Sequence, residues 1–305
     1  MPGPVTVIGL GAFGSRLAKS IKARKPECRI TGSDLEQAAE QAALARKYAD
    51  RIEHNQLSAV KNAGLILLAV PADQTKSVLE HIGHDVRPDA VILDCCPAKT
   101  AAIGWARQFL SRPEAFAGIW AGSGTLFTAA DAAVSEAALK TAAELAALLG
   151  LKHTFADPAE LDGLITSVYD LPILAAAGLT ACLSGRSGWK DGQNAAGEIL
   201  QQMTAPARIK TDRDGSETAL LSHRESTVRL LDEYIRTLGT IRDLIRLQDE
   251  SGLRTLTENS RKAAGVLLRA PSRPRGEPVM PDLPGSADLL RQTFFGGLLR
   301  KRNRN

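Results

Sequence analysis

The sequence predicts an α/β chain, in which a doubly wound parallel sheet at the N-terminus is followed by an all-helical C-terminal domain. Short β-branched and aliphatic runs alternate with helical stretches in the first half of the chain, as in parallel strands joined by crossover helices. From residue 158 onward the pattern is almost purely helical. With 305 residues the chain is long enough for two domains, and we expect them at 1–155 and 156–268, with a tail at 269–305.

Buried parallel strands are expected where apolar runs end in turn residues. The predicted strands are Val5–Ile8, Arg29–Gly32, Leu65–Val70, Val91–Asp94 and Lys152–Ala156. The predicted helices between them are Ser15–Lys22, Glu36–Lys47, Asp73–His81 and Ala132–Leu149, the last closed by Gly150 as a left-handed cap.

The second domain opens with a helix start, in which Asp157 is the N-cap and Pro158 the first helical residue. Gly185–Gly192 has the composition of a loop between helices. A long helix follows, with an apolar stripe at three- and four-residue steps. The stripe consists of Val228, Leu231, Ile235, Leu238, Ile241 and Ile245. Packing within one subunit and a homodimer interface through the helical domain both explain such a stripe.

The composition is that of a soluble globular protein, since apolar residues make up 44% and charged residues 24% of the chain. The longest apolar stretches, 63–72 and 171–183, are shorter than the ~20 residues of a membrane-spanning helix. The N-terminus lacks the basic region and apolar core of a signal peptide. We therefore expect a cytoplasmic protein without a membrane segment.

The net charge of +4 is concentrated in the tail. Residues 269–305 hold eight Lys or Arg and three Asp or Glu, so the remaining residues sum to −1. Five prolines between Pro271 and Pro284 exclude a packed core there and indicate a flexible arm. Its basic end is compatible with nucleic acid, but base rates favour a solvated tail that docks Phe294 and Phe295 on the body.

No metal site is expected. The four cysteines have no metal-ligand spacing, and Cys95 and Cys96 lie in an apolar run that predicts buried thiols. His81 and His84 lie three residues apart without a third ligand nearby, which favours solvated side chains.

A glycine motif between the first strand and the first helix predicts a dinucleotide site of the Rossmann type. Gly9, Gly11 and Gly14 allow the tight turn and the approach of a pyrophosphate to the helix N-terminus. The loop residues Leu10, Ala12 and Phe13 complete the predicted contact. Asp34 comes twenty residues after Gly14, where a carboxylate accepts hydrogen bonds from the ribose hydroxyls. A carboxylate repels a 2′-phosphate, so NAD is favoured, with NADP as the alternative.

Two further strand ends contribute to the predicted site, because parallel strands end together at one edge of the sheet. Ala69, Val70 and Pro71 are expected to face the nicotinamide half of the cofactor. Lys99 follows the strand that ends at Asp94, and it is a candidate for holding a substrate carboxylate or for acid–base work. A solvent-facing lysine at a helix start is the alternative.

The order and spacing of these motifs resemble the prephenate and arogenate dehydrogenase family. The resemblance covers roughly residues 5 to 265. Besides the motifs above, it rests on Phe116–Gly118, Asp157–Asp162, Leu171-Pro172 and Arg224-Glu225. It implies a dimer-forming helical domain and an enzyme that oxidises a cyclohexadienol with NAD or NADP, losing carbon dioxide as the ring becomes aromatic.

The chain departs from the family at three polar positions. The family's catalytic histidine falls at Trp120, a second histidine falls at Asp170, and a serine falls at Pro97. Because an indole cannot accept a proton, the base would have to be Lys99, Asp170 or Tyr169, or the substrate differs. We take Lys99 and Asp170 as the catalytic candidates.

Trp120 and Arg224 are the candidate substrate contacts, with an ordinary surface ion pair as the alternative for Arg224. Three functions follow: a prephenate-type dehydrogenase of tyrosine biosynthesis, an oxidoreductase acting on another small carboxylate, and a dinucleotide-binding protein without catalysis.

Overall fold

The computed structural model describes residues 3–208 and 216–269, so most of the predicted tail lies outside the described residues. The described chain forms two compact units, divided between Leu161 and Asp162. We describe each unit by itself, as unit 1 and unit 2.

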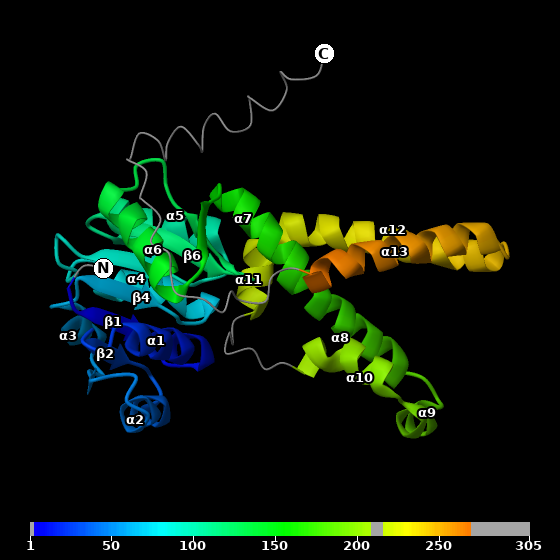
Figure 1. The fold of residues 1–305 in the computed structure, drawn as a ribbon, viewed down its shortest axis with the longest axis horizontal. Helices are drawn as coiled ribbons and strands as arrows, with labels where there is room; N and C mark the ends of the chain where they lie inside the picture. The colour runs from blue at the N-terminus through cyan, green and yellow to red at the C-terminus, as the bar shows by residue number, and fades with distance from the viewer. Residues whose placement is uncertain (1–2, 209–215, 270–305) are drawn as a thin grey trace, which may run out of the picture. The chain divides into compact units, whose positions relative to one another are not determined.

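Unit 1 is built on a sheet of eight strands in the order β3-β2-β1-β4-β5-β6-β7-β8 (Figure 1). All neighbours are parallel except β6 and β7, which are antiparallel. The strands are β1 (Val5–Ile8), β2 (Ile30–Ser33), β3 (Arg51–Ile52), β4 (Leu65–Leu68), β5 (Val91–Asp94), β6 (Phe116–Ala121), β7 (Thr125–Ala129) and β8 (Lys152–Phe155).

Helices cover both faces of this sheet, which is the doubly wound arrangement that the sequence predicts. The helices α1 and α6 contact each other on one face, and α3, α4 and α5 form a second group. The bounds are α1 (Ala12–Arg24), α2 (Gln37–Ala45), α3 (Gln56–Val60), α4 (Ala72–Ile82), α5 (Lys99–Phe109), η1 (Pro113–Ala115) and α6 (Glu136–Leu149).

The core of unit 1 lies along the three central strands. Every residue of β1, β4 and β5 is buried, as expected for parallel strands covered on both faces. Their last residues are in register, because Ile8 pairs with Leu68 and Leu68 pairs with Asp94. The strand order reverses between β1 and β4, so these ends border the switch point at which α/β proteins bind ligands.

The predicted elements are confirmed with small shifts of their ends. The helix α6 ends at Gly150 in the left-handed conformation, with φ of +68°, and Asp157 accepts hydrogen bonds from the amides of Ala159 and Glu160 as an N-cap does. Three strands were not predicted: β3, β6 and β7. Part of the predicted loop at 185–192 is helical, because α9 begins at Trp189.

Unit 2 is entirely helical in its described residues. It contains the end of α7 (Pro158–Ile165), the π-helix η2 (Thr166–Asp170), α8 (Leu171–Ser184), α9 (Trp189–Ala195), α10 (Glu198–Thr204), the 3₁₀-helix η3 (Ala205–Arg208), α11 (Ser216–Ser222), α12 (Arg224–Arg246) and α13 (Glu250–Arg269). Helices α12 and α13 form a contacting pair (Figure 1).

Large apolar side chains of unit 2 are left exposed. In the predicted stripe of α12, Val228, Ile235 and Ile245 are each more than half exposed. The helical run Pro158–Ser184 is also apolar, and by length and composition alone it is long enough to cross a membrane. Only 22% of its most apolar 18-residue stretch is buried. An exposed apolar surface of this kind is typical of an interaction site.

Candidate functional site

The turn between β1 and α1 depends on two glycines. Gly9 has a φ of +92°, and a Cβ atom there would lie 2.5 Å from the carbonyl oxygen of Ala69. A Cβ atom on Gly14 would lie 1.9 Å from the carbonyl oxygen of Gly9. Gly9 therefore lets the end of β1 pass close to β4, and Gly14 lets α1 pack against the turn.

The N-terminus of α1 is open to a ligand. Gly11 and Ala12 are exposed, Phe13 is half-buried against the core, and Leu10 is buried. Gly11 is the N-cap and provides no side-chain hydrogen bond, so the first amides of the helix are not capped from within. Such amides, together with the helix dipole, suit a pyrophosphate.

Asp34 lies directly after β2 and is tied to the glycine turn. Its Oδ2 accepts a hydrogen bond from the amide of Leu10 at 2.5 Å, and its Oδ1 accepts one from the amide of Glu36 at 2.8 Å. The carboxylate is half-buried and keeps further lone pairs for ribose hydroxyls. The predicted glycine turn and the predicted acidic residue are thus brought together in space.

Sequence reasoning missed a second carboxylate behind Asp34. Glu40 is buried in α2, and its Oε1 accepts a hydrogen bond from the amide of Asp34 at 3.1 Å. The Nδ1 atom of His54 lies 3.3 Å from both carboxylate oxygens of Glu40. The amphipathic spacing of α2 placed Glu40 at a core-facing position, which was the available signal.

The residues after β4 form the other side of the turn. Ala69 donates its amide hydrogen to the carbonyl of Ile8 at 2.8 Å, and Pro71 is the N-cap of α4. Ala69, Val70 and Pro71 are all half-buried. The end of β4 borders the glycine turn, because the Ala69 carbonyl is the group that approaches Gly9 most closely.

The end of β5 carries a buried pair of opposite charges. Asp94 and Lys99 are both 0% exposed. The ammonium of Lys99 donates hydrogen bonds to the carbonyls of Ile119 (2.6 Å) and Asp94 (3.2 Å). Burial raises the pKa of Asp94 to about 6, against the opposing effects of the Lys99 charge and the Cys96 amide. Lys99 therefore ties the ends of β5 and β6 together.

Trp120 and the two cysteines near this pair offer no proton acceptor in place of a histidine. Trp120 lies in β6, is 9% exposed and pairs in register with Phe127 of β7. Cys95 and Cys96 are buried free thiols, as predicted. Burial raises the pKa of Cys96 to about 12, so this thiol stays protonated near neutral pH.

Unit 2 holds a separate buried polar cluster. Asp170 ends the π-helix and is 7% exposed. Its Oδ2 lies 3.9 Å from Nδ1 of His223, whose Nε2 lies 3.3 Å from Oδ1 of Asp162. Sequence reasoning missed this cluster, because His223 is distant in the chain. The spacing of Asp162, Thr166 and Asp170 at four-residue steps was the local signal for one helical face.

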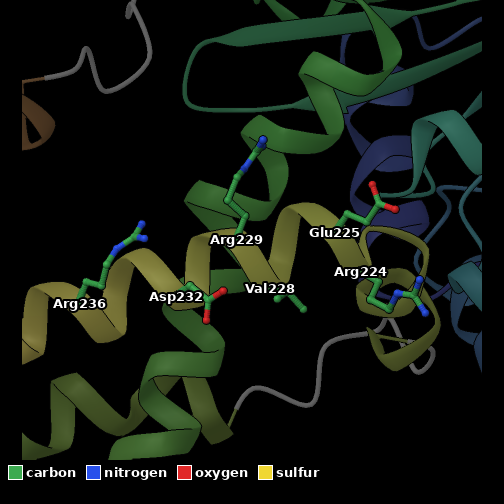
Figure 2. A pocket seen from close by; sticks show the side chains of 6 residues that line it. All are labelled: Arg224, Glu225, Val228, Arg229, Asp232 and Arg236. Atoms are coloured by element: carbon green, nitrogen blue, oxygen red, sulfur yellow. The ribbon is translucent and has the colours of Figure 1, made fainter.

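Arg224 begins α12 and lines a pocket of about 410 Å³. All the lining residues belong to α12: Arg224, Glu225, Val228, Arg229, Asp232 and Arg236 (Figure 2). The lining carries three guanidinium groups, two carboxylates and one apolar side chain along α12. The balance of charge in the pocket favours an anionic group. Within the described ranges, no three or more His, Cys, Asp or Glu side chains are arranged to hold a metal ion.

Comparison with known proteins finds sequence similarity in the first part of the chain. Residues 17–136 match the family model "Prephenate dehydrogenase, nucleotide-binding domain". A prephenate dehydrogenase of Bacillus subtilis is 30% identical over 119 residues, which is 39% of this chain and 32% of the relative. The match therefore spans about a third of the length of this relative.

Solved structures extend the likeness in fold to most of the chain. A prephenate dehydrogenase from A. aeolicus, in complex with hydroxyphenyl propionate and NAD+, has a TM-score of 0.79 at 17% identity, covering 87% of this chain and 99% of that one. A Synechocystis arogenate dehydrogenase has a TM-score of 0.69 at 20% identity, with the same coverage. Residues 17–136 therefore match the nucleotide-binding domain of prephenate dehydrogenases in sequence, and the chain shares the overall fold of these solved dehydrogenases.

Proposed function

We propose that this protein is an NAD-dependent dehydrogenase of the prephenate type, which oxidises a cyclohexadienol carboxylate such as prephenate or arogenate in tyrosine biosynthesis. The observation that carries the proposal is the connection of Asp34 to the glycine turn through the Leu10 amide, at the switch point of the sheet. Asp34 lies within the segment that matches the nucleotide-binding domain of prephenate dehydrogenases, and the glycine turn directly precedes that segment.

The residues of unit 1 fit a nicotinamide dinucleotide. Gly9 leaves no room for a side chain, and the exposed amides at Gly11 and Ala12 would hold the pyrophosphate. The carboxylate of Asp34 would hold the ribose hydroxyls, and its charge favours NAD over NADP. When bound, NAD supplies the acceptor for the hydride that leaves the carbinol carbon.

The chain itself must provide a group that takes the hydroxyl proton as the hydride leaves. Lys99 and Asp170 are the candidates. We assign the proton acceptor to Asp170, because the Lys99 ammonium donates hydrogen bonds to two carbonyls and has no lone pair while it is charged. In this proposal Lys99 holds the strand ends, Trp120 supplies an apolar wall, and Arg224 binds a substrate carboxylate.

The test is the formation of reduced nicotinamide when the purified full chain is mixed with NAD and either prephenate or arogenate. Turnover that falls at least about 100-fold in Asp170→Asn supports both the reaction and the assignment. Glu160→Gln, which removes an exposed carboxylate of α7, is the matched control. NAD binding without turnover of either compound would contradict the proposed reaction and favour a different substrate or a binding role.

We further propose that the protein is a cytoplasmic homodimer that associates through its helical unit. The exposed stripe of α12 and the sparsely buried run 158–184 together supply the apolar surface that a second copy would cover. A membrane is the competing partner for this surface, but the run contains the carboxylates of Asp162 and Asp170, which favours packing against protein.

Sedimentation equilibrium without detergent tests this assembly. We expect twice the chain mass for the wild type and a shift toward monomer for Ile235→Glu, because Ile235 is 61% exposed in the monomer. Thr237→Glu, an exposed position on the same helix, is the matched control. A wild type that is monomeric at micromolar concentration, or that requires lipid for solubility, would contradict the dimer.

A further inference from the structure

A buried histidine in unit 2 has no role in the function proposed above. His223 is the N-cap residue of α12, and its side chain is only 3% exposed. The ring lies among three elements, since Asp162 belongs to α7, Asp170 belongs to η2, and His223 itself precedes α12. These two carboxylates are the charged groups that act on the ring.

The positions of the acceptors determine the protonation state of this ring. Its Nε2 lies 3.3 Å from Oδ1 of Asp162. Its Nδ1 lies 3.4 Å from Oγ1 of Thr166 and 3.9 Å from Oδ2 of Asp170. The Thr166 hydroxyl donates its own hydrogen to the carbonyl of Asp162 at 2.9 Å, so it is left as an acceptor toward the ring. A neutral imidazole has one N–H, whereas oxygen atoms lie within 3.9 Å of both nitrogens here, with Nε2 in charge contact and not in a hydrogen bond.

We propose that His223 is a positioning residue, held as an imidazolium between Asp162 and Asp170, that fixes the Asp170 carboxylate for proton transfer and joins it to the start of α12. This inference rests on the proposed function. It adds a residue outside the segment that matches the nucleotide-binding family. It also means that the residue that positions the Asp170 carboxylate belongs to unit 2, as Asp170 itself does.

Two physical terms oppose this arrangement and two support it. Burial and the positive end of the α12 dipole disfavour a charged ring at the N-cap. The negative charges of Asp162 and Asp170, at 3.3 and 3.9 Å from the ring nitrogens, favour it. Burial lowers the pKa of His223, but the two carboxylates outweigh burial and raise it to about 9. The ring is therefore charged at neutral pH.

The cluster leaves Asp170 suited to accept a proton. One imidazolium between two carboxylates gives the three groups a net charge of −1. Oδ2 of Asp170 is buried and has no hydrogen-bond partner among the described residues, and the side chain keeps 9% exposure. A carboxylate held in place but not fully satisfied has the capacity to take a hydroxyl proton.

The first experiment reads the ring directly and needs no activity. Long-range ¹H–¹⁵N NMR on the full chain, with the five histidines assigned by substitution, should show both nitrogens of His223 protonated at pH 7.5. Asp170→Asn and Asp162→Asn should each lower its titration midpoint, by about one pH unit. His153, half-buried on β8 with one hydroxyl partner, provides the internal comparison. A neutral His223 ring at pH 7.5 overturns the inference.

The second experiment tests whether His223 acts through Asp170. His223→Gln should lower kcat by about 10- to 100-fold, with NAD affinity and the substrate KM within about twofold of wild type. The double variant with Asp170→Asn should be no slower than Asp170→Asn alone, because the two residues act on one step. His153→Gln is the control.

The positioning role is overturned if the fold losses in kcat of the two single variants multiply in the double variant. It is also overturned if His223→Gln changes kcat and NAD affinity equally, because both results show a general structural effect. A wild type that turns over neither prephenate nor arogenate refutes the proposed function. In that case the NMR result still decides whether the imidazolium exists, so the two failures are distinguishable.

Discussion

Replacing Lys99 with methionine should destabilise unit 1, because the substitution keeps the volume and removes the charge. The ammonium donates two hydrogen bonds to buried carbonyls, at 2.6 and 3.2 Å, and lies beside the fully buried Asp94. Hydrogen bonds to charged groups contribute ~1.5–3 kcal/mol each. Removing one partner of a buried charge pair costs ~3–5 kcal/mol. We therefore expect Lys99→Met to lower the free energy of unfolding by about 4 kcal/mol.

Urea unfolding, followed by circular dichroism in the wild type and in Lys99→Met, measures this loss. Lys140→Met, on the exposed side of α6, is the matched control and should change stability by less than about 0.5 kcal/mol. Adding Asp94→Asn to Lys99→Met should recover about 2 kcal/mol, since no buried carboxylate is then left without its cation. If Lys99→Met unfolds like the control but loses turnover, the structural role is wrong and Lys99 is a catalytic group.

Three further predictions concern the glycine turn, the ribose site and the buried imidazole. Gly14→Ala should abolish NAD binding in isothermal titration, because its Cβ would lie 1.9 Å from the Gly9 carbonyl oxygen; wild-type affinity would exclude the observed turn. Asp34→Ser should weaken NAD binding about 10- to 100-fold and narrow the preference over NADP, whereas Glu36→Gln should not; equal losses would contradict a ribose contact. The folded-state pKa of His223 is raised to about 9, so its stabilisation is complete below pH 6.5 and is lost toward pH 9. Relative to His223→Gln, the wild type should lose about 3 kcal/mol of unfolding free energy over that range; parallel pH curves would refute this.

The elements that carry the proposed nucleotide site were predictable, because each has a local cause. The strands β1, β4 and β5 are short aliphatic runs buried on both faces, and periodicity detects them. The glycine turn and Asp34 have a fixed spacing that follows from the βα unit. Their contact through the Leu10 amide confirms that the spacing predicted geometry as well as fold.

The missed elements depend on distant partners. The strand β3 has only two residues. The strands β6 and β7 form the one antiparallel pair of the described sheet, toward the edge that ends in β8. The segment Phe116–Ala121 contains Ala117 and Gly118 side by side and lacks a period-two alternation, which weakens a strand pattern. The pairing with β7 stabilises the strand β6, and the local sequence of β6 does not reveal which strand it pairs with.

The roles of the polar residues were also hidden from the local sequence, because they depend on which charged side chains lie close together in the folded chain. Lys99 was a catalytic candidate by position, but its burial and its two carbonyl partners depend on β6. Asp170 was a candidate because it replaces a histidine of the family. Its partner His223 lies 53 residues later in the chain, so the cluster appears only once the helices are packed.

Charge balance now separates two roles that the sequence left open. In unit 1, Asp94 and Lys99 neutralise each other, and the protons of Lys99 are directed to carbonyl groups. The hydrogen bonds of the Lys99 ammonium to the carbonyls of Asp94 and Ile119 indicate that the pair serves to fix the strand ends. In unit 2, one imidazole faces two carboxylates, and the three groups keep a negative charge even when the ring is protonated. Negative charge beside a carboxylate favours its uptake of a proton. On this argument, the proton-accepting role that Trp120 cannot perform falls to Asp170 and not to Lys99.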